Sequence, residues 1–117
     1  MLEQELILQR EKAWLELRKK LKSQFGKAPD LNALLMLIGL RELGQMRTKY
    51  SKEEKQDLMH IATCKLLSED GYYALEHLDQ DGWPHWKALK PLPPLSLSQQ
   101  EDLLKERILI YFESMEY

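Results

Sequence analysis

The sequence has little of several features that would commit it to one class of protein. It holds a single cysteine in 117 residues, so no disulfide can form within the chain, and Cys64 favours a reducing compartment. Its 17 basic and 19 acidic side chains nearly cancel, which excludes the strong overall field of a nucleic-acid coat protein or a polybasic membrane binder. It also has no internal repeat. The length predicts one domain, 1–117, with a core of its own.

The chain also lacks a membrane-spanning run and a secretory signal. Its longest apolar run, Leu31–Leu40, has about half of the roughly 20 residues that a spanning helix needs. Residues 1–12, MLEQELILQREK, carry acidic side chains where a signal peptide needs a basic segment and then a continuous apolar core. We therefore expect a cytoplasmic protein that does not bind membranes.

The common catalytic and nucleotide-binding motifs are missing as well. The sequence contains no GxGxxG, GxxxxGK[ST], HExxH or GxSxG pattern. We therefore assign no catalytic residue and no cofactor, and we expect a protein that is not an enzyme.

Helical periodicity runs through almost the whole chain and predicts four helices. The first is expected within residues 1–25 and ends near Gly26, and one of its faces carries an apolar stripe. The stripe consists of Leu6, Ile7, Ala13, Trp14, Leu17, Leu21 and Phe25. The second helix follows Asp30, is apolar on every face, and should form the centre of the core.

Two capping boxes, in which a serine is followed three residues later by glutamate, predict where the last two helices begin. Ser51 with Glu54 opens the third helix, and Ser98 with Glu101 opens the fourth. The pattern predicts an all-α fold of about four helices packed as a small bundle. Its one exception is a short irregular hairpin or Trp/Pro-rich loop, in which Tyr72–Leu78 and Trp83–Leu89 flank the turn DQDG.

Four blocks of sequence carry a resemblance to a known family. They are LNALLMLIGLRELG, YSKEEKQDLMHIATCKLL, GYYALEHLDQDGWPHWK and LPPLSLSQQEDLLKE, which lie between about Asp30 and Glu113. These blocks resemble a family of short, conserved, uncharacterised bacterial helical proteins. The resemblance implies a cytosolic bacterial protein. Because that family has no assigned activity, cofactor or catalytic residue, it implies no site residue here.

The segment Asp79–Pro94 is the best candidate for a binding surface, because it gathers two tryptophans, one histidine and four prolines. We expect one of its tryptophans to be nearly buried and the other to be exposed. Trp14 of the first helix is a further aromatic candidate, because it could complete the core of a second copy of the chain. The candidate partner-binding residues are Trp83, Trp86, His85, Tyr72, Tyr73 and Trp14.

His60 and Cys64 are four residues apart on the third helix, a spacing that could supply at most half of a metal site. A zinc ion would need two further ligands, from His77, His85, Asp79 or Asp81. His60 could also serve as a base for Cys64, but the sequence offers no third residue to orient it. We expect a packed, inert thiol and no metal. DQDG also fails as a calcium loop, because His77 and Ala88 would occupy its first and last ligand positions.

Charge is unevenly distributed along the chain. Residues 1–27 hold seven basic and four acidic side chains, whereas residues 66–117 hold four basic and ten acidic ones. A basic first helix could therefore match an acidic surface of this chain or of a second copy. Together these features favour an interaction module that binds a protein partner, with a homodimer as the simplest form.

The alternative function is a winged-helix-like nucleic-acid binder, with Ser51–Leu67 as recognition helix and Tyr72–Leu89 as wing. Glu53, Glu54 and Asp57 would then face phosphates, so nucleic acid is not the partner we expect. A small metal-dependent enzyme has the least support.

Overall fold

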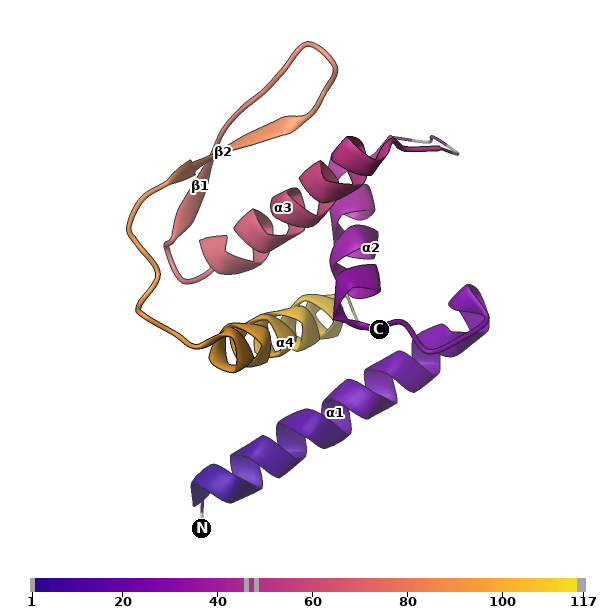
Figure 1. Cartoon of the computed structure of the whole chain (residues 1–117), viewed down its shortest axis with the longest axis vertical. Coiled ribbons are helices and arrows are strands. Elements are labelled where there is room, and N and C mark those ends of the chain that lie inside the picture. Colours follow the sequence, from indigo (N-terminus) through magenta and orange to yellow (C-terminus); the bar gives the residue numbers. More distant parts are fainter. Residues whose placement is uncertain (1, 46, 48, 116–117) are drawn as a thin grey trace. The chain divides into compact units, whose positions relative to one another are not determined.

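The computed structural model describes residues 2–45, 47 and 49–115 and contains four helices and one β-hairpin (Figure 1). In chain order the elements are α1 (Leu2–Phe25), α2 (Leu31–Leu43), α3 (Lys52–Ser68), β1 (Tyr73–Leu78), β2 (Pro84–Ala88) and α4 (Leu97–Ser114). The contacts of these residues group into two compact units. Unit 1 draws on residues 1–31 and 96–117, and unit 2 on residues 32–95.

The predicted number of helices and the position of the hairpin are confirmed for the described residues. The all-α class needs a correction, because the hairpin forms a two-stranded antiparallel sheet, whose register shifts between Leu75 and His77. Both of its strands are edges, so Pro84 can begin β2 without breaking a ladder. Packing of the helices as one bundle and the single domain stay predictions. Within the described ranges, no helix combines the length and the apolar character that crossing a membrane requires.

The first predicted capping box is confirmed and the second is wrong. At α3, Ser51 Oγ accepts a hydrogen bond from the Glu54 backbone N–H at 3.1 Å, and the Glu54 carboxylate accepts one from the Ser51 N–H at 2.9 Å. At α4 the same exchange joins Ser96 and Gln99, also at 3.1 and 2.9 Å. The fourth helix therefore begins two residues earlier than Ser98 and Glu101 predicted.

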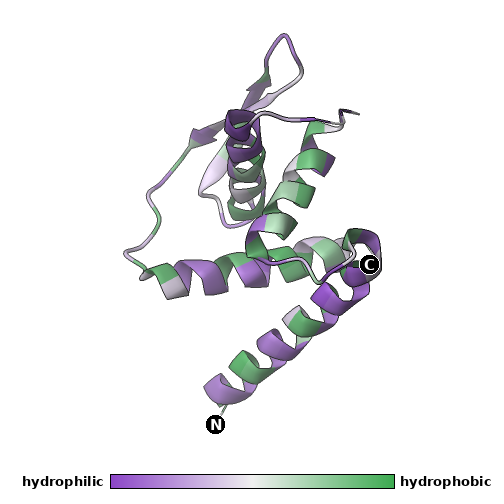
Figure 2. Cartoon of the chain, turned by 45° about the vertical axis from the view of Figure 1, so that its right-hand side comes forward, coloured by the Kyte–Doolittle hydropathy of each residue, from purple (hydrophilic) through white to green (hydrophobic). Residues whose placement is uncertain are grey.

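Unit 2 is organised around a close crossing of α2 and α3. A Cβ added at Gly39 would lie 2.7 Å from the carbonyl carbon of Leu58 and 3.0 Å from its Cα, so only glycine fits there. The hydrophobic colouring of α2 agrees with its role as a buried helix (Figure 2). The buried residues of the two helices are Leu34, Leu35, Ile38, Gly39 and Leu43 of α2 and Leu58, Ile61, Ala62, Cys64, Leu66 and Leu67 of α3.

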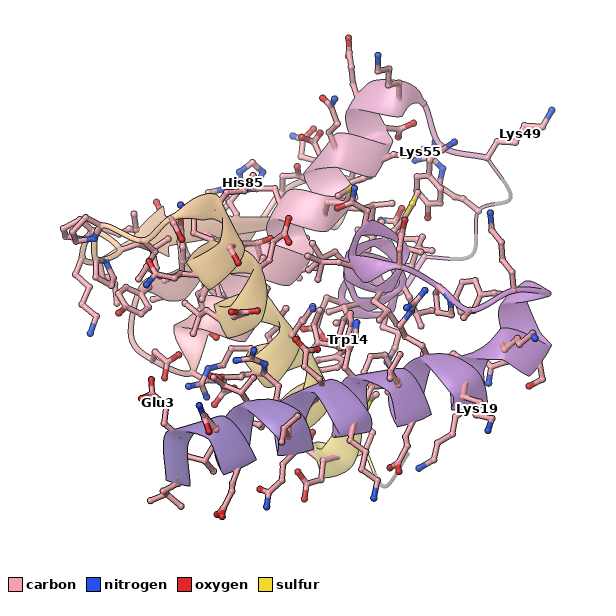
Figure 3. The ribbon with its side chains drawn as sticks, turned by 60° about the horizontal axis from the view of Figure 1, so that its bottom comes forward. Glu3, Trp14, Lys19, Lys49, Lys55 and His85 are labelled. Atoms are coloured by element: carbon pink, nitrogen blue, oxygen red, sulfur yellow. The ribbon has the colours of Figure 1, made fainter. Side chains whose placement is uncertain are left out.

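Unit 1 pairs α1 with α4. Arg10 forms ion pairs with Asp102 and Glu106 at 3.4 Å, and Lys105 forms one with Glu11 at 3.5 Å. Trp14 of α1 is only 5% exposed. Figure 3 shows it pointing toward α4, between Glu3 near one end of α1 and Lys19 near the other.

The predicted apolar stripe of α1 is buried over only part of its length. Trp14, Leu17 and Leu21 are buried, but Leu6 and Ile7 are 57% and 43% exposed. The stripe is therefore a continuous feature of the sequence that the fold buries only from Trp14 to Leu21. Leu6 and Ile7 lie on the same side of the helix as the buried residues, but the fold covers them less completely.

Candidate functional site

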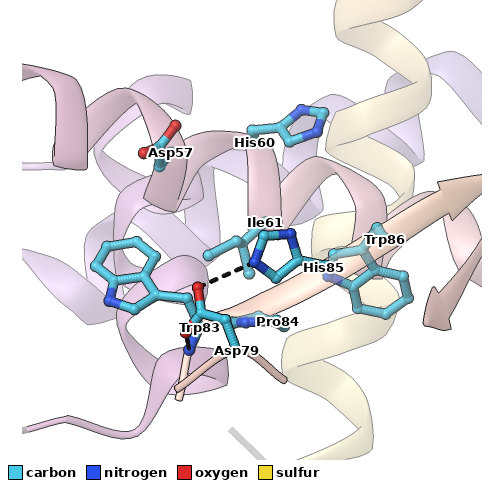
Figure 4. Close-up of a pocket in the computed structure, with 8 residues that line it drawn as sticks. All are labelled: Asp57, His60, Ile61, Asp79, Trp83, Pro84, His85 and Trp86. Atoms are coloured by element: carbon cyan, nitrogen blue, oxygen red, sulfur yellow. Dashed lines mark hydrogen bonds and ion pairs between the residues drawn. The ribbon is translucent and has the colours of Figure 1, made fainter. Parts of the chain in front are cut away.

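Unit 2 contains a pocket of about 280 Å³ between α3 and the start of β2 (Figure 4). Its lining brings together two carboxylates, two imidazoles, two indoles and two apolar side chains. These residues are Asp57, His60 and Ile61 of α3 and Asp79, Trp83, Pro84, His85 and Trp86 of the hairpin. Three predicted candidates, Trp83, Trp86 and His85, thus line one pocket.

The hairpin turn is organised by one carboxylate. Asp79 Oδ1 accepts hydrogen bonds from the backbone N–H groups of Asp81 and Trp83, each at 2.9 Å, and Asp79 Oδ2 lies 3.0 Å from His85 Nε2. These bonds favour the ionised form, so the His85 contact first and the Trp83 N–H second hold the pKa of Asp79 below its ordinary value. Gly82 completes the turn with a φ of +85°. Asp79 is therefore ionised at neutral pH.

A chain of contacts from the start of α3 supports Trp83. Tyr50 meets the Trp83 ring edge to face, with the ring centroids 6.5 Å apart, and Arg47 lies 4.7 Å above the Tyr50 ring. Arg47 also forms two hydrogen bonds with Glu54, at 2.6 and 3.3 Å, which lower the pKa of Glu54. Gln45 donates a hydrogen bond to the carbonyl oxygen of Asp81. Unit 2 therefore fixes the hairpin tip at several points.

Neither pocket tryptophan is buried. Trp83 and Trp86 both have intermediate exposure, so the prediction that one is nearly buried and the other exposed is wrong. The Nε1 atom of Trp86 is nevertheless shielded from solvent and has no hydrogen-bond partner among the described residues. A two-stranded hairpin resting on one helix leaves part of each indole uncovered. That remaining surface is available for a ligand.

The α3 side of the pocket gives little support for metal or thiol chemistry. His60 Nε2 lies 3.5 Å from Cys64 Sγ, so the predicted neighbours do meet. Cys64 is fully buried, and desolvation raises the pKa of its thiol to about 11. The thiol therefore stays protonated at neutral pH. Within the residues that the structure describes, no group of three His, Cys, Asp or Glu side chains is arranged to hold a metal ion.

The remaining predicted candidates lie away from the pocket lining. The Tyr72 ring lies 4.6 Å below Lys90 Nζ, and Tyr73 pairs with Ala88 in the β-ladder. Trp14 belongs to unit 1 and has little exposed surface to offer a partner. His77 is the cross-strand partner of His85, and the two rings stack with centroids 4.7 Å apart.

Sequence reasoning missed Asp57, Ile61 and Pro84 as parts of this site. Asp57 and Ile61 are four residues apart, so helical spacing places them on one face of α3. That spacing could have suggested a shared surface, but only the folded hairpin shows what the surface contacts.

Comparison of the chain with family models, with curated proteins and with solved structures found no match.

Proposed function

We propose that this chain is a non-enzymatic cytoplasmic interaction module whose unit 2 pocket receives a basic side chain of a partner protein. One observation carries the proposal. Two carboxylates and two partly exposed indoles line the same concavity. The resemblance to uncharacterised bacterial proteins fits this role but supplies no ligand.

Charge and shape together favour lysine or arginine. Asp79 is held ionised by its hydrogen bonds, and Asp57 supplies a second carboxylate from α3 (Figure 4). A cation is attracted to both carboxylates and to the faces of aromatic rings, whereas an acidic side chain is repelled. Ile61 and Pro84 provide apolar surface for the methylene stem of a long basic side chain.

Selection of random displayed peptides on the intact protein tests the proposal. The natural sequence should enrich peptides that contain lysine or arginine. Asp57→Asn should weaken binding of the selected peptides roughly tenfold, because a charge-assisted contact is lost. Asp81→Asn is the matched control, since this substitution also removes one carboxylate charge, but from a residue of the hairpin turn that does not line the pocket. Enrichment of acidic peptides, or equal losses in the two variants, would refute the proposal.

The alternative of a winged-helix-like nucleic-acid binder has weaker support. The order of α2, α3 and hairpin suits it, but the first turn of α3 carries Glu53 and Glu54. Carboxylates at the start of a recognition helix would repel phosphates. A gel shift with mixed duplexes at low salt should show no retention.

A further inference from the structure

Unit 1 exposes an apolar helix end that its own partner helix does not cover. Leu2, Leu6 and Leu8 are 72%, 57% and 69% exposed. Leu2 and Leu6 belong to the same side of α1 as Ala13 and Leu17, because these residues recur at three- and four-residue steps. An apolar helix face continues here beyond the part that is buried.

The same unit contains a groove further along this face. It has a volume of about 320 Å³ and lies between α1 and α4. Its apolar floor consists of Ala13, Leu17, Leu109 and Phe112, and Glu16, Lys20 and Glu113 form its charged rim. A groove of this kind suits an aliphatic side chain from a neighbouring helix.

The leucines of the helix end cannot fill the groove of their own chain. Leu6 and Leu17 are eleven residues apart on one continuous helix, which separates them by about 16 Å along its axis. Only another molecule can bring such a helix end to this groove. We therefore propose that two copies of this chain associate through antiparallel α1 helices, each inserting Leu6 into the α1–α4 groove of the other.

Charge complementarity supports a second copy as the occupant. The acidic residues near the start of α1 are Glu3 and Glu5, and its last two turns carry Lys19, Lys20 and Lys22. The antiparallel register that places Leu6 opposite Leu17 also places Glu3 opposite Lys20. Two-fold symmetry repeats each contact, so every favourable pair counts twice. The proposal concerns unit 1 alone and does not depend on the pocket of unit 2.

Sedimentation equilibrium of the full chain tests this arrangement. The natural sequence should dimerise at micromolar concentrations. Leu6→Gln should raise the dissociation constant by about 100-fold or more, because one buried leucine is lost from each copy. Leu15→Gln is the matched control, since Leu15 is 61% exposed on the same helix and does not line the groove. Helix content from circular dichroism should be unchanged in both variants.

A charge-reversal series tests the antiparallel register. Glu3→Lys and Lys20→Glu should each weaken the dimer roughly fivefold, and the double variant should recover the natural dissociation constant. A monomer at high micromolar concentration would overturn the proposal and leave the groove to another occupant. Equal effects of Leu6→Gln and Leu15→Gln, or no recovery in the double variant, would overturn it too.

Discussion

Unit 1 and unit 2 use charged side chains in different ways. In unit 1, Arg10 and Lys105 pair with carboxylates across α1 and α4, so charge ties two amphipathic helices together. In unit 2, α2 crosses α3 through apolar contacts at Gly39, and the carboxylates Asp57 and Asp79 line a pocket instead. The difference separates a region where ion pairs join two helices from one where two carboxylates line a concavity.

The aromatic residues differ in the same way. Trp14 of unit 1 is buried beside α4, with Lys105 Nζ 5.6 Å from its ring. Trp83 and Trp86 of unit 2 are partly exposed and line a concavity. Because buried aromatics stabilise the fold and exposed ones in a pocket recognise ligands, substitutions should separate the two roles.

The largest effect is expected at the helix crossing of unit 2. Gly39→Ala would force a Cβ against the backbone of Leu58, which cannot move aside as a side chain would. We expect a loss of at least about 3 kcal/mol in the free energy of unfolding, measured by urea denaturation. Gly44→Ala is a useful contrast, because its added Cβ meets nothing within 4 Å and any loss would come from its φ of +70° alone.

Truncation of the tryptophans should destabilise the protein more in unit 1 than in unit 2. Trp14→Ala should cost about 3 to 5 kcal/mol of stability, as large core truncations do. Trp83→Ala and Trp86→Ala should each cost about 1 to 2 kcal/mol, because part of each indole is already exposed. Urea unfolding followed by circular dichroism measures all three. Equal losses at the three sites would remove the distinction between core and pocket.

The thiol of Cys64 should react slowly. Its pKa of about 11, against an ordinary 9.0, lowers the thiolate fraction at pH 8 about a hundredfold, and labelling by a thiol reagent should slow by the same factor. A raised pKa stabilises the fold below pH 9 and loses that contribution as pH rises toward 11. Cys64→Ala should remove this alkaline loss. Fast labelling of the folded protein would contradict burial of the thiol.

The smallest predicted effect concerns the pKa of Asp79 and the stability of the fold at acid pH. Asp79 has a pKa below its ordinary 3.8, so its contribution to stability is complete above that value and is lost as pH falls through the lowered pKa. His85→Gln should raise the Asp79 pKa toward 3.8, because the largest cause of the shift is removed. An NMR titration of the Asp79 carboxyl carbon measures this pKa in the natural protein and in the variant. An unchanged Asp79 pKa would show that His85 does not organise the turn.

Local sequence signals predicted much of the fold. The Ser51 capping box and the DQDG turn depend on residues close together in the chain, so both could be identified without tertiary information. The fourth helix was misplaced because Ser96 and Ser98 each begin a plausible capping box, with Gln99 and Glu101 respectively. Periodicity alone does not choose between two overlapping caps.

The site was harder to predict because it depends on distant parts of the chain. The sequence identified Trp83, Trp86 and His85 as candidates from local composition. It could not show that Asp57 of α3 faces them, since that contact depends on how the hairpin packs on the helix. The exposure of Leu6 could not be predicted for a similar reason. Periodicity defines a helix face, but it does not show how far another helix covers that face.

The central claim, that the unit 2 pocket binds a basic side chain, is tested most directly by NMR of the indole N–H groups. A short blocked peptide centred on one arginine is added to the intact protein, and the same peptide with glutamate serves as control. We predict concentration-dependent shifts of the Trp83 and Trp86 signals with the arginine peptide and no shift of the Trp14 signal. Equal responses to both peptides, or no response at Trp83 and Trp86, would contradict the account.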